Sequence, residues 1–238
     1  MIWVDALYEK IRYDRQAKSM AVQVVIGIDK KGRREVLAIE PVHEESEPTY
    51  CKLFDNLKTR GLKDVWLVVS DAHKGLVKAI QKSFVATSRQ RCKVHFMRNI
   101  LAHIPAKGKA IFAEKLKQIW LQPDLDNAGT YTRMLVESYE HRYSEEIEVL
   151  ESRLEDSLQF YCFEQIDSRK ISSTNMRECL NRETRRRTSV VEIFPNMDSY
   201  TRLVTFYLLE YSEDWSTGRS YIRQEIIEHI QAERKRAA

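Results

Sequence analysis

Three carboxylates stand at positions where an ionised side chain is costly unless its charge is compensated. Asp5 interrupts the apolar run at residues 2–8, Asp71 ends the apolar run at residues 65–70, and Glu178 precedes a burst of arginines. A carboxylate at the end of a buried strand needs a cation or a hydrogen-bond network beside it. If the three converge, they can bind divalent metal, and a basic surface next to them can bind phosphate. These residue types predict phosphoryl transfer on nucleic acid.

Phosphodiester chemistry needs an activated oxygen nucleophile, a neutralised transition state and a stabilised leaving oxygen, which two divalent ions supply together. Mg²⁺ prefers a few carboxylates together with water and substrate oxygens. We therefore expect two Mg²⁺ (or Mn²⁺) ions, with Asp5 bridging both and with Asp71 and Glu178 each holding one side. Taken alone, each carboxylate is interpreted more simply as a helix cap or a salt-bridge partner.

The basic residues are concentrated close to Glu178. Residues 169–187 contain seven basic and two acidic side chains, although the whole chain carries a net charge of only +4. On a helix, Arg182 and Arg185 share the face of Glu178, because they follow it by four and seven positions. A basic row at this place predicts contacts to DNA phosphates, and the alternative is a solvated helix face. The predicted DNA-binding residues are Arg169, Lys170, Arg177, Arg182, Arg185, Arg186 and Arg187.

The elements that must position these residues follow from periodicity. Strands are predicted at residues 1–9, 20–29, 34–40 and 64–70, with a short strand at 91–94, a hairpin turn at 29–33, and helices at 47–60 and 73–84. The order βββαβαβ is that of an α/β fold with a ribonuclease H-like mixed sheet. In that fold the first strand is central and the end of the fourth lies beside it, so Asp5 and Asp71 are expected side by side.

Residues 100–163 show helical periodicity throughout, with breaks at 105–108 and 122–126. We interpret this stretch as an all-α insertion before the last catalytic helix, which is predicted at 173–187. Pro195 is expected in the first turn of a further helix that ends near Tyr211. The predicted domains are a first core part at 1–99, the insertion at 100–168, the catalytic and packing helices at 169–212, and a polar tail at 213–238.

Cys92 and His95 form a pair with metal-ligand spacing. A closed zinc site needs four ligands, usually with a second pair at short spacing, which this sequence lacks. Two interpretations stay open: a pair that orients an acidic ligand or contacts phosphate, and a buried cysteine beside a satisfied histidine. His73, two residues after Asp71, has the same ambiguity, and Asn175 is a further candidate for active-site support.

Bulk properties fit a globular enzyme. The 238 residues include 43% hydrophobic residues and four cysteines without a Cys-x-x-Cys pair. No apolar run approaches the roughly 20 residues of a membrane span, and the N-terminus has no secretory pattern. We expect no membrane partner and a reducing, cytoplasmic setting associated with the nucleoid.

Several blocks of this sequence match a known family. They are VDALY at 4–8, GRREVL at 32–37, VSDAHKGL at 69–76, QRCKVHFMRN at 90–99, TNMRECLNRE at 174–183, RRRT at 185–188 and IFPN at 193–196. Through these blocks, nearly the whole chain resembles the catalytic region of bacterial Mutator-like insertion-sequence transposases, which are related to plant Mutator elements.

The resemblance implies a DDE transposase with a ribonuclease H-like fold, in which Asp5, Asp71 and Glu178 are the catalytic metal ligands. Cys92 and His95 occupy the family's Cys/Asp-x-x-His motif near the active site. The family cuts the ends of an element and joins the freed 3′-hydroxyl to target DNA without a covalent protein–DNA intermediate. The implied partners are double-stranded DNA, as element ends and target, and further copies of the chain in a homo-oligomer.

Two departures from the family pattern are visible. Members usually carry a long N-terminal DNA-binding region, whereas Asp5 is the fifth residue here, so an N-terminally truncated copy is expected. Members often have a Trp before Arg-Lys-Ile, where this chain has Ser168. If that aromatic ring stacks on DNA, its loss weakens substrate positioning. Two alternative functions stay open: a ribonuclease H-like nuclease that only hydrolyses, and an inactive DNA-binding relic or regulator.

Overall fold

The computed structural model describes residues 1–237, apart from the side chains of residues 175–179 and 237. The chain forms two compact units. The first consists of residues 1–88 together with the chain from Thr174 onward, and the second runs from Arg89 to Ser173. The first unit combines strands and helices, and the second is almost entirely helical.

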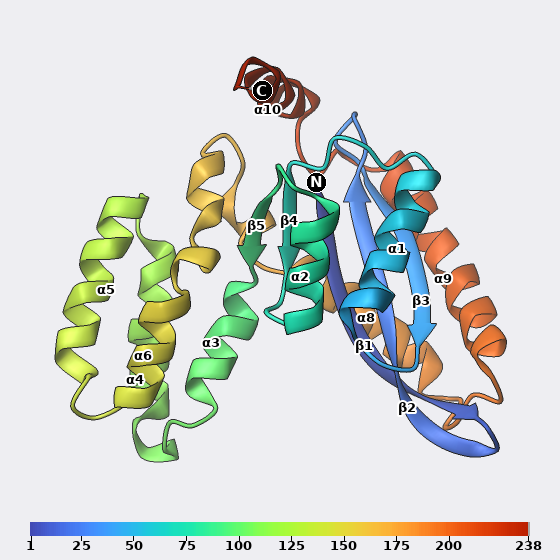
Figure 1. The fold of residues 1–238 in the computed structure, drawn as a ribbon, viewed down its shortest axis with the longest axis horizontal. Coiled ribbons are helices and arrows are strands. Elements are labelled where there is room, and N and C mark those ends of the chain that lie inside the picture. Colours follow the sequence, from blue (N-terminus) through green and yellow to red (C-terminus); the bar gives the residue numbers. More distant parts are fainter. Residues whose placement is uncertain (238) are drawn as a thin grey trace. The chain divides into compact units, whose positions relative to one another are not determined.

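A mixed five-stranded sheet organises the first unit, and its last strand reaches the boundary between the units. The strands are β1 (Ile2–Tyr13), β2 (Gln16–Ile28), β3 (Arg34–Val42), β4 (Leu67–Ser70) and β5 (Ser88–Arg91), in the order β3-β2-β1-β4-β5 (Figure 1). β1 runs antiparallel to β2 and parallel to β4. The predicted central place of the first strand, with the fourth beside it, is confirmed.

The first two strands are longer than the sequence pattern predicts. Their pairing continues to Tyr13 opposite Gln16, and only Asp14 and Arg15 form the turn, with φ of 49° and 62°. The end of this hairpin is polar, so hydrophobic alternation gives no signal there, and backbone pairing alone extends the strands. The fourth strand is shorter than predicted, since β4 begins only at Leu67. Val65 and Trp66 continue the apolar run and are buried, but they are not part of the strand.

The short strand predicted at residues 91–94 is wrong. β5 ends at Arg91, and helix α3 (Lys93–Leu101) begins two residues later. The carbonyl oxygen of Cys92 already accepts the first helical hydrogen bond, from the N–H of Phe96 at 3.0 Å. Phe96 and Ile100 are both buried, and their spacing of one helical turn favours the helix over a strand.

Helices α1 (Glu47–Thr59) and α2 (Lys74–Ser83) pack against one another and against the sheet (Figure 1). Ser46 caps α1, because its hydroxyl accepts the N–H of Thr49 while the Thr49 hydroxyl accepts the N–H of Ser46. The residues of α1 that face the core are those predicted from helical spacing: Tyr50, Leu53, Phe54 and Leu57. They join Val4 and Val25 in one apolar cluster, which fixes the sheet face that these two helices cover.

The C-terminal part of the first unit contributes α8 (Asn175–Thr188), α9 (Met197–Thr217) and α10 (Gln224–Ala237). The prediction that Pro195 lies in the first turn of α9 is wrong. Asn196 follows Pro195 as the N-cap of the helix and accepts the N–H of Ser199 at 2.8 Å. α9 also runs past Tyr211 to Thr217. Its buried residues are Tyr200, Val204, Tyr207 and Leu208, whereas Leu203, predicted on the same face, is 40% exposed.

The chain after α9 returns to the turn between β2 and β3. The N–H of Tyr221 donates to the carbonyl oxygen of Gly32 at 2.7 Å, and Gly32 has the positive φ, 77°, that the turn prediction required. Arg34 lies between the rings of Trp215 and Tyr221, 4.5 and 4.9 Å from their centroids. Burial lowers the pKa of Arg34 below its ordinary value. These contacts fix the segment that leads into α10.

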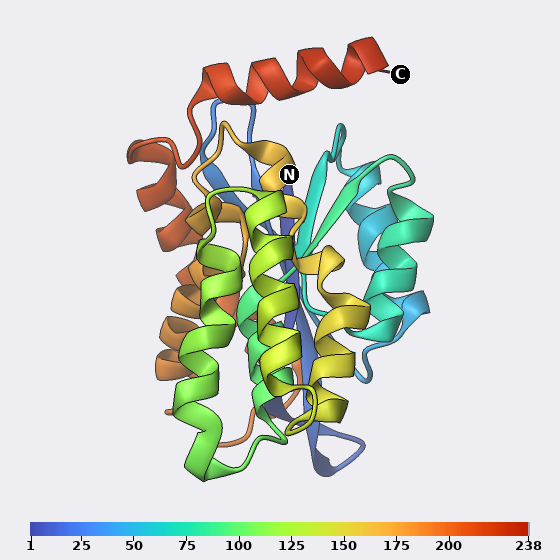
Figure 2. The ribbon, with the colours of Figure 1, turned by 90° about the vertical axis from the view of Figure 1, so that its left-hand side faces the viewer.

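The second unit is a set of short helices: α3, α4 (Ala106–Gln118), α5 (Leu125–Tyr139), α6 (Ser144–Arg153), α7 (Ser168–Ile171), and three 3₁₀ turns at Ile119–Leu121, Glu155–Ser157 and Gln159–Phe163. Figures 1 and 2 show α4, α5 and α6 side by side. The helical pattern predicted at residues 100–163 is confirmed. The break predicted at 105–108 lies earlier, at residues 102–105, since α3 ends at Leu101 and α4 begins at Ala106. The break predicted at 122–126 ends where Asp124 caps α5.

Candidate functional site

The carboxylates of Asp5, within β1, and Asp71, directly after β4, come together where the parallel pairing of these two strands ends. Val4 on β1 is paired with Ser70 on β4, so the next residue of each chain segment is an aspartate at the matching position. One carboxylate oxygen of Asp5 and one of Asp71 lie within 4.8 Å of one another. Asp5 is only 5% exposed, and Asp71 is half-buried. The structure therefore brings together two of the three predicted acids.

Backbone N–H groups orient both carboxylates. Asp5 Oδ1 accepts the N–H of Ala6 at 2.7 Å, and Asp71 Oδ1 accepts the N–H of His73 at 3.1 Å. These hydrogen bonds hold the two carboxylates in place, and two negative charges this close repel each other. A cation between them removes that repulsion, and hard carboxylate oxygens suit Mg²⁺ or Mn²⁺. Oxygens that share one Mg²⁺ lie at most about 4.2 Å apart, which is comparable with the 4.8 Å limit within which this pair lies.

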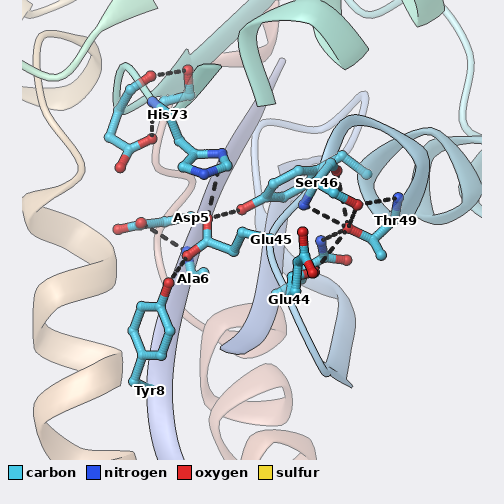
Figure 3. A network of polar contacts seen from close by, with 12 residues as sticks. Asp5, Ala6, Tyr8, Glu44, Glu45, Ser46, Thr49 and His73 are labelled. Atoms are coloured by element: carbon cyan, nitrogen blue, oxygen red, sulfur yellow. Dashed lines mark hydrogen bonds and ion pairs between the residues drawn. The ribbon is translucent and has the colours of Figure 1, made fainter. Parts of the chain in front are cut away.

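A third carboxylate, Glu45, lies in the same region and was missed in the sequence. It is held by two tyrosines: the hydroxyl of Tyr8 donates to its Oε1 and the hydroxyl of Tyr50 donates to its Oε2, each at 2.7 Å. Its side chain is only 10% exposed. Figure 3 shows the Glu45 carboxylate between Tyr8 and the His73 imidazole, close to Asp5. We call Tyr8, Glu45, Tyr50 and His73 the Glu45 cluster.

The charge of Glu45 acts on both tyrosines. Its hydrogen bond, followed by burial and by the charges of Glu45 and Asp71, raises the pKa of Tyr8 to about 12. For Tyr50, burial comes first, and the hydrogen bond to Glu45 and the charges of Glu45, Asp71 and Tyr8 raise the pKa further. Because Asp71 acts on the tyrosines that bind Glu45, the cluster and the aspartate pair share one electrostatic environment.

His73 connects the cluster to the aspartate pair. Its backbone N–H binds Asp71, while its Nδ1 lies 3.8 Å from Glu45 Oε2. That nitrogen is buried and makes no hydrogen bond within the described part of the chain. The imidazole also lies beside the ring of Tyr50, with 6.2 Å between ring centroids. His73, predicted as a support residue, is thus placed next to Asp71.

Glu178, Asn175 and Arg177 belong to helix α8, but their side chains lie outside the described residues. Further along α8, the Thr188 hydroxyl donates to Glu9 Oε1 of β1 at 3.2 Å. Burial raises the pKa of Glu9, and the hydrogen bond from Thr188 and the charge of Arg185 oppose that effect. Glu9 and Asp5 lie on the same face of β1, so the C-terminal part of α8 lies on the sheet face toward which Asp5 points.

The predicted DNA-binding residues of α8 that the structure describes are all exposed: Arg182, Arg185, Arg186 and Arg187. Arg186 Nε lies 3.6 Å from Glu183 Oε2, and the Arg187 guanidinium lies 4.4 Å from the centre of the Tyr207 ring. In the second unit, Lys170 is half-buried and the exposed Arg169 makes an ion pair with Asp167 at 2.7 Å, which lowers the pKa of Asp167 to about 2.

Cys92 and His95 lie at the start of α3 in the second unit. Cys92 is fully buried as the residue before the helix, and His95 is half-buried. Within the described part of the chain, Cys92 belongs to no group of three or more metal-ligating side chains.

The sequence held only a weak signal for the Glu45 cluster. His43, Glu44 and Glu45 precede the N-cap Ser46, and acidic residues near a helix N-terminus are usually explained by the helix dipole. No local pattern links Glu45 to Tyr8 or Tyr50.

Among the helices in the described part of the chain, none combines the length and the apolar character that a membrane span requires.

Comparison with known proteins identifies the family. The family described as "Transposase, Mutator family" matches residues 1–218. The transposase for insertion sequence element IS256 in transposon Tn4001 of Staphylococcus aureus is 39% identical over 224 residues, covering 93% of this chain and 57% of the relative. The ISRM5 transposase of Rhizobium meliloti is 39% identical over 236 residues, covering 99% of this chain and 59% of the relative.

The transposase for IS1081 of Mycobacterium tuberculosis is 34% identical over 228 residues, covering 96% of this chain and 55% of the relative. The chain thus spans somewhat more than half the length of the relatives it matches. Both the family match and the two relatives at 39% identity cover most of its residues. This protein therefore belongs to the Mutator family of transposases.

Proposed function

We propose that this chain is the catalytic domain of a DDE transposase with a ribonuclease H-like fold. The observation that carries the proposal is the Asp5–Asp71 pair, two carboxylates within 4.8 Å directly after the last paired residues of β1 and β4, in a chain of the Mutator family. The strand order β3-β2-β1-β4-β5 is compatible with that fold. The helical second unit is, in this proposal, the insertion that precedes the last catalytic helix.

Asp5, Asp71 and Glu178 are proposed as the ligands of two Mg²⁺ or Mn²⁺ ions. When bound, such ions activate an oxygen nucleophile and neutralise the charge that develops on the phosphate. Asp5 and Asp71 bind through carboxylate oxygens that Ala6 and His73 orient. Glu178 joins from α8, and Asn175, Cys92 and His95 are proposed as supporting residues.

The proposed substrate is double-stranded DNA. The exposed arginines of α8, together with Arg169, Lys170 and Arg177, bind its phosphates and position the strand without reading sequence. Cleavage adds water across a phosphodiester and leaves a 3′-hydroxyl and a 5′-phosphate. In strand transfer, that 3′-hydroxyl oxygen attacks a target phosphorus, the bond to the old 3′-oxygen breaks, and the departing oxygen takes the proton. Transfer of paired ends implies a homo-oligomer.

Strand transfer itself is the decisive measurement. The protein is incubated with Mn²⁺, supercoiled plasmid and a labelled duplex that carries the end of its element with a free 3′-hydroxyl. Covalent joining of the label to the plasmid, lost in Asp5→Asn and Asp71→Asn, supports the transposase. Nicking without joining indicates a nuclease that only hydrolyses. Joining that persists in both variants contradicts the assignment of the metal ligands.

A further inference from the structure

The end of the β1–β2 hairpin is a two-stranded ribbon. β2 pairs with β3 only from Ala21 onward, whereas β1 and β2 stay paired as far as Tyr13 and Gln16. Every residue from 12 to 19 is exposed, and Figure 1 shows the two strands continuing past the end of β3. The base of the ribbon is anchored, because Phe194 exchanges backbone hydrogen bonds with Lys10 and Arg12 at 3.0 and 2.7 Å.

Positive charge covers this ribbon on both faces and at its tip. Lys10 and Arg12 project from one face of β1, Lys18 projects from the opposite face of β2, and Arg15 is in the turn. Asp14 is the single acidic residue between Lys10 and Lys18. Among the described residues, no ion pair neutralises Lys10, Arg12 or Arg15.

The turn retains an arginine where the backbone favours glycine. Asp14 and Arg15 both have positive φ, as in the two-residue type I′ turn, whose second position is usually Gly. Asp tolerates the left-handed region, but a long side chain such as that of Arg15 is disfavoured there. Residues in disfavoured backbone conformations cluster at sites that bind ligands, which makes Arg15 a candidate for a ligand contact.

We propose that the ribbon from Lys10 to Lys18 enters the major groove of duplex DNA and contacts phosphates on both of its walls. The major groove is about 12 Å wide and admits a two-stranded β-ribbon. Basic side chains on the two faces then point toward opposite walls, and Arg15 leads at the tip. This inference rests on the proposed function and deepens it, since β1 also carries Asp5. The ribbon extends the DNA contact beyond the arginines of α8.

Binding of a labelled duplex of about 30 base pairs, measured by fluorescence anisotropy in EDTA at several salt concentrations, tests the proposal. The triple variant Lys10→Ala, Arg12→Ala, Arg15→Gly is expected to bind at least about 10-fold more weakly, with a salt slope lower by about 3. A matched control, Lys31→Ala, Lys52→Ala, Lys63→Ala, removes three exposed positive charges of the same unit. It is expected to bind within about twofold of the parent.

Arg15→Gly alone separates binding from folding. It removes the disfavoured conformation, so its melting temperature is expected to equal or exceed that of the parent, while the salt slope of DNA binding falls by about 1. Weaker binding together with a lower melting temperature would make the turn merely structural and overturn the proposal. Equal losses in the lysine control would also overturn it, because net charge would then explain the effect.

An RNA duplex of the same sequence tests the groove. Its deep, narrow major groove cannot admit the ribbon, so the triple variant is expected to bind it nearly as well as the parent does. An equal loss on RNA contradicts the groove contact. Binding is measured in EDTA, so it does not depend on the proposed metal site. Unchanged DNA binding by the triple variant would refute the ribbon contact but not the proposed catalysis. If the triple variant binds DNA more weakly and the parent shows no strand transfer in Mn²⁺, only the proposed catalysis is refuted.

Discussion

Asp5 and Asp71 each follow the last residue of the β1–β4 pairing, and their carboxylates have oxygens within 4.8 Å of one another. The register of β1 and β4 produces this pair, since the residue after Val4 in β1 and the residue after Ser70 at the end of β4 are both aspartates. One carboxylate buried in this way is costly, and two are costlier because they repel. The fold thus keeps a local destabilisation that a cation in the proposed metal site would relieve.

Asp5→Asn and Asp71→Asn are expected to leave the metal-free protein as stable as the parent or more stable, because each removes the repulsion. Both variants should lose stabilisation by Mn²⁺, which in the parent reaches about 2.7 kcal/mol when the ion is at 100 times its Kd. Differential scanning fluorimetry with and without MnCl₂ measures both effects. Asp55→Asn, on the surface of α1, is the control and should keep the full Mn²⁺ response. A full response in Asp5→Asn would contradict the proposed metal site.

Tyr50→Phe is expected to destabilise the protein by about 1.5–3 kcal/mol, because the buried Glu45 carboxylate loses a charge-assisted hydrogen bond. Tyr8→Phe removes the other bond at a side chain that is 54% exposed, where water can replace it, so its cost should be below about 1 kcal/mol. Urea denaturation of both variants gives the comparison. Equal stabilities of Tyr50→Phe and the parent would show that Glu45 does not depend on its tyrosines.

Alkaline pH is expected to weaken the Glu45 cluster. Tyr8 has a pKa raised from 10.0 to about 12, so the folded protein holds the proton more tightly than the unfolded chain. The stabilisation is therefore complete below pH 10 and is lost as the pH rises through about 12. The free energy of unfolding measured at pH 9, 10 and 11 should fall less steeply in Tyr8→Phe than in the parent. Identical slopes would mean that Tyr8 titrates alike in both states.

Gly32→Ala is expected to cost about 3 kcal/mol or more. Gly32 has a φ of 77°, and a Cβ there would lie 1.7 Å from the carbonyl oxygen of Ile222, so strain and a backbone clash add together. Gly61→Ala is the matched control, because Gly61 also has positive φ, 105°, but a Cβ there meets nothing within 4 Å. Its cost should be about 1–2 kcal/mol. Similar urea midpoints for the two variants would contradict the packing of the C-terminal segment on this turn.

The sequence predicted best where a local pattern reports directly on burial. Helical spacing identified the core residues of α1, and the apolar run before Asp71 identified β4. It failed where backbone pairing or capping decides. The ribbon from Lys10 to Lys18 has no hydrophobic alternation, so the strands predicted from the sequence are too short. Lys93 is predicted in a strand, although helix α3 begins at this residue, directly after the N-cap Cys92.

By itself, the sequence determined the family, because the matching residues run along most of the chain, and its carboxylates and arginines are the basis of the chemistry proposed above. Only the tertiary structure decided which side chains meet. The register between β1 and β4 places Asp5 beside Asp71, and the loop before α1 carries Glu45 to the hydroxyls of Tyr8 and Tyr50. Neither follows from local periodicity, because contacts between distant segments depend on how strands and loops pack, and periodicity reports only which face of an element is buried.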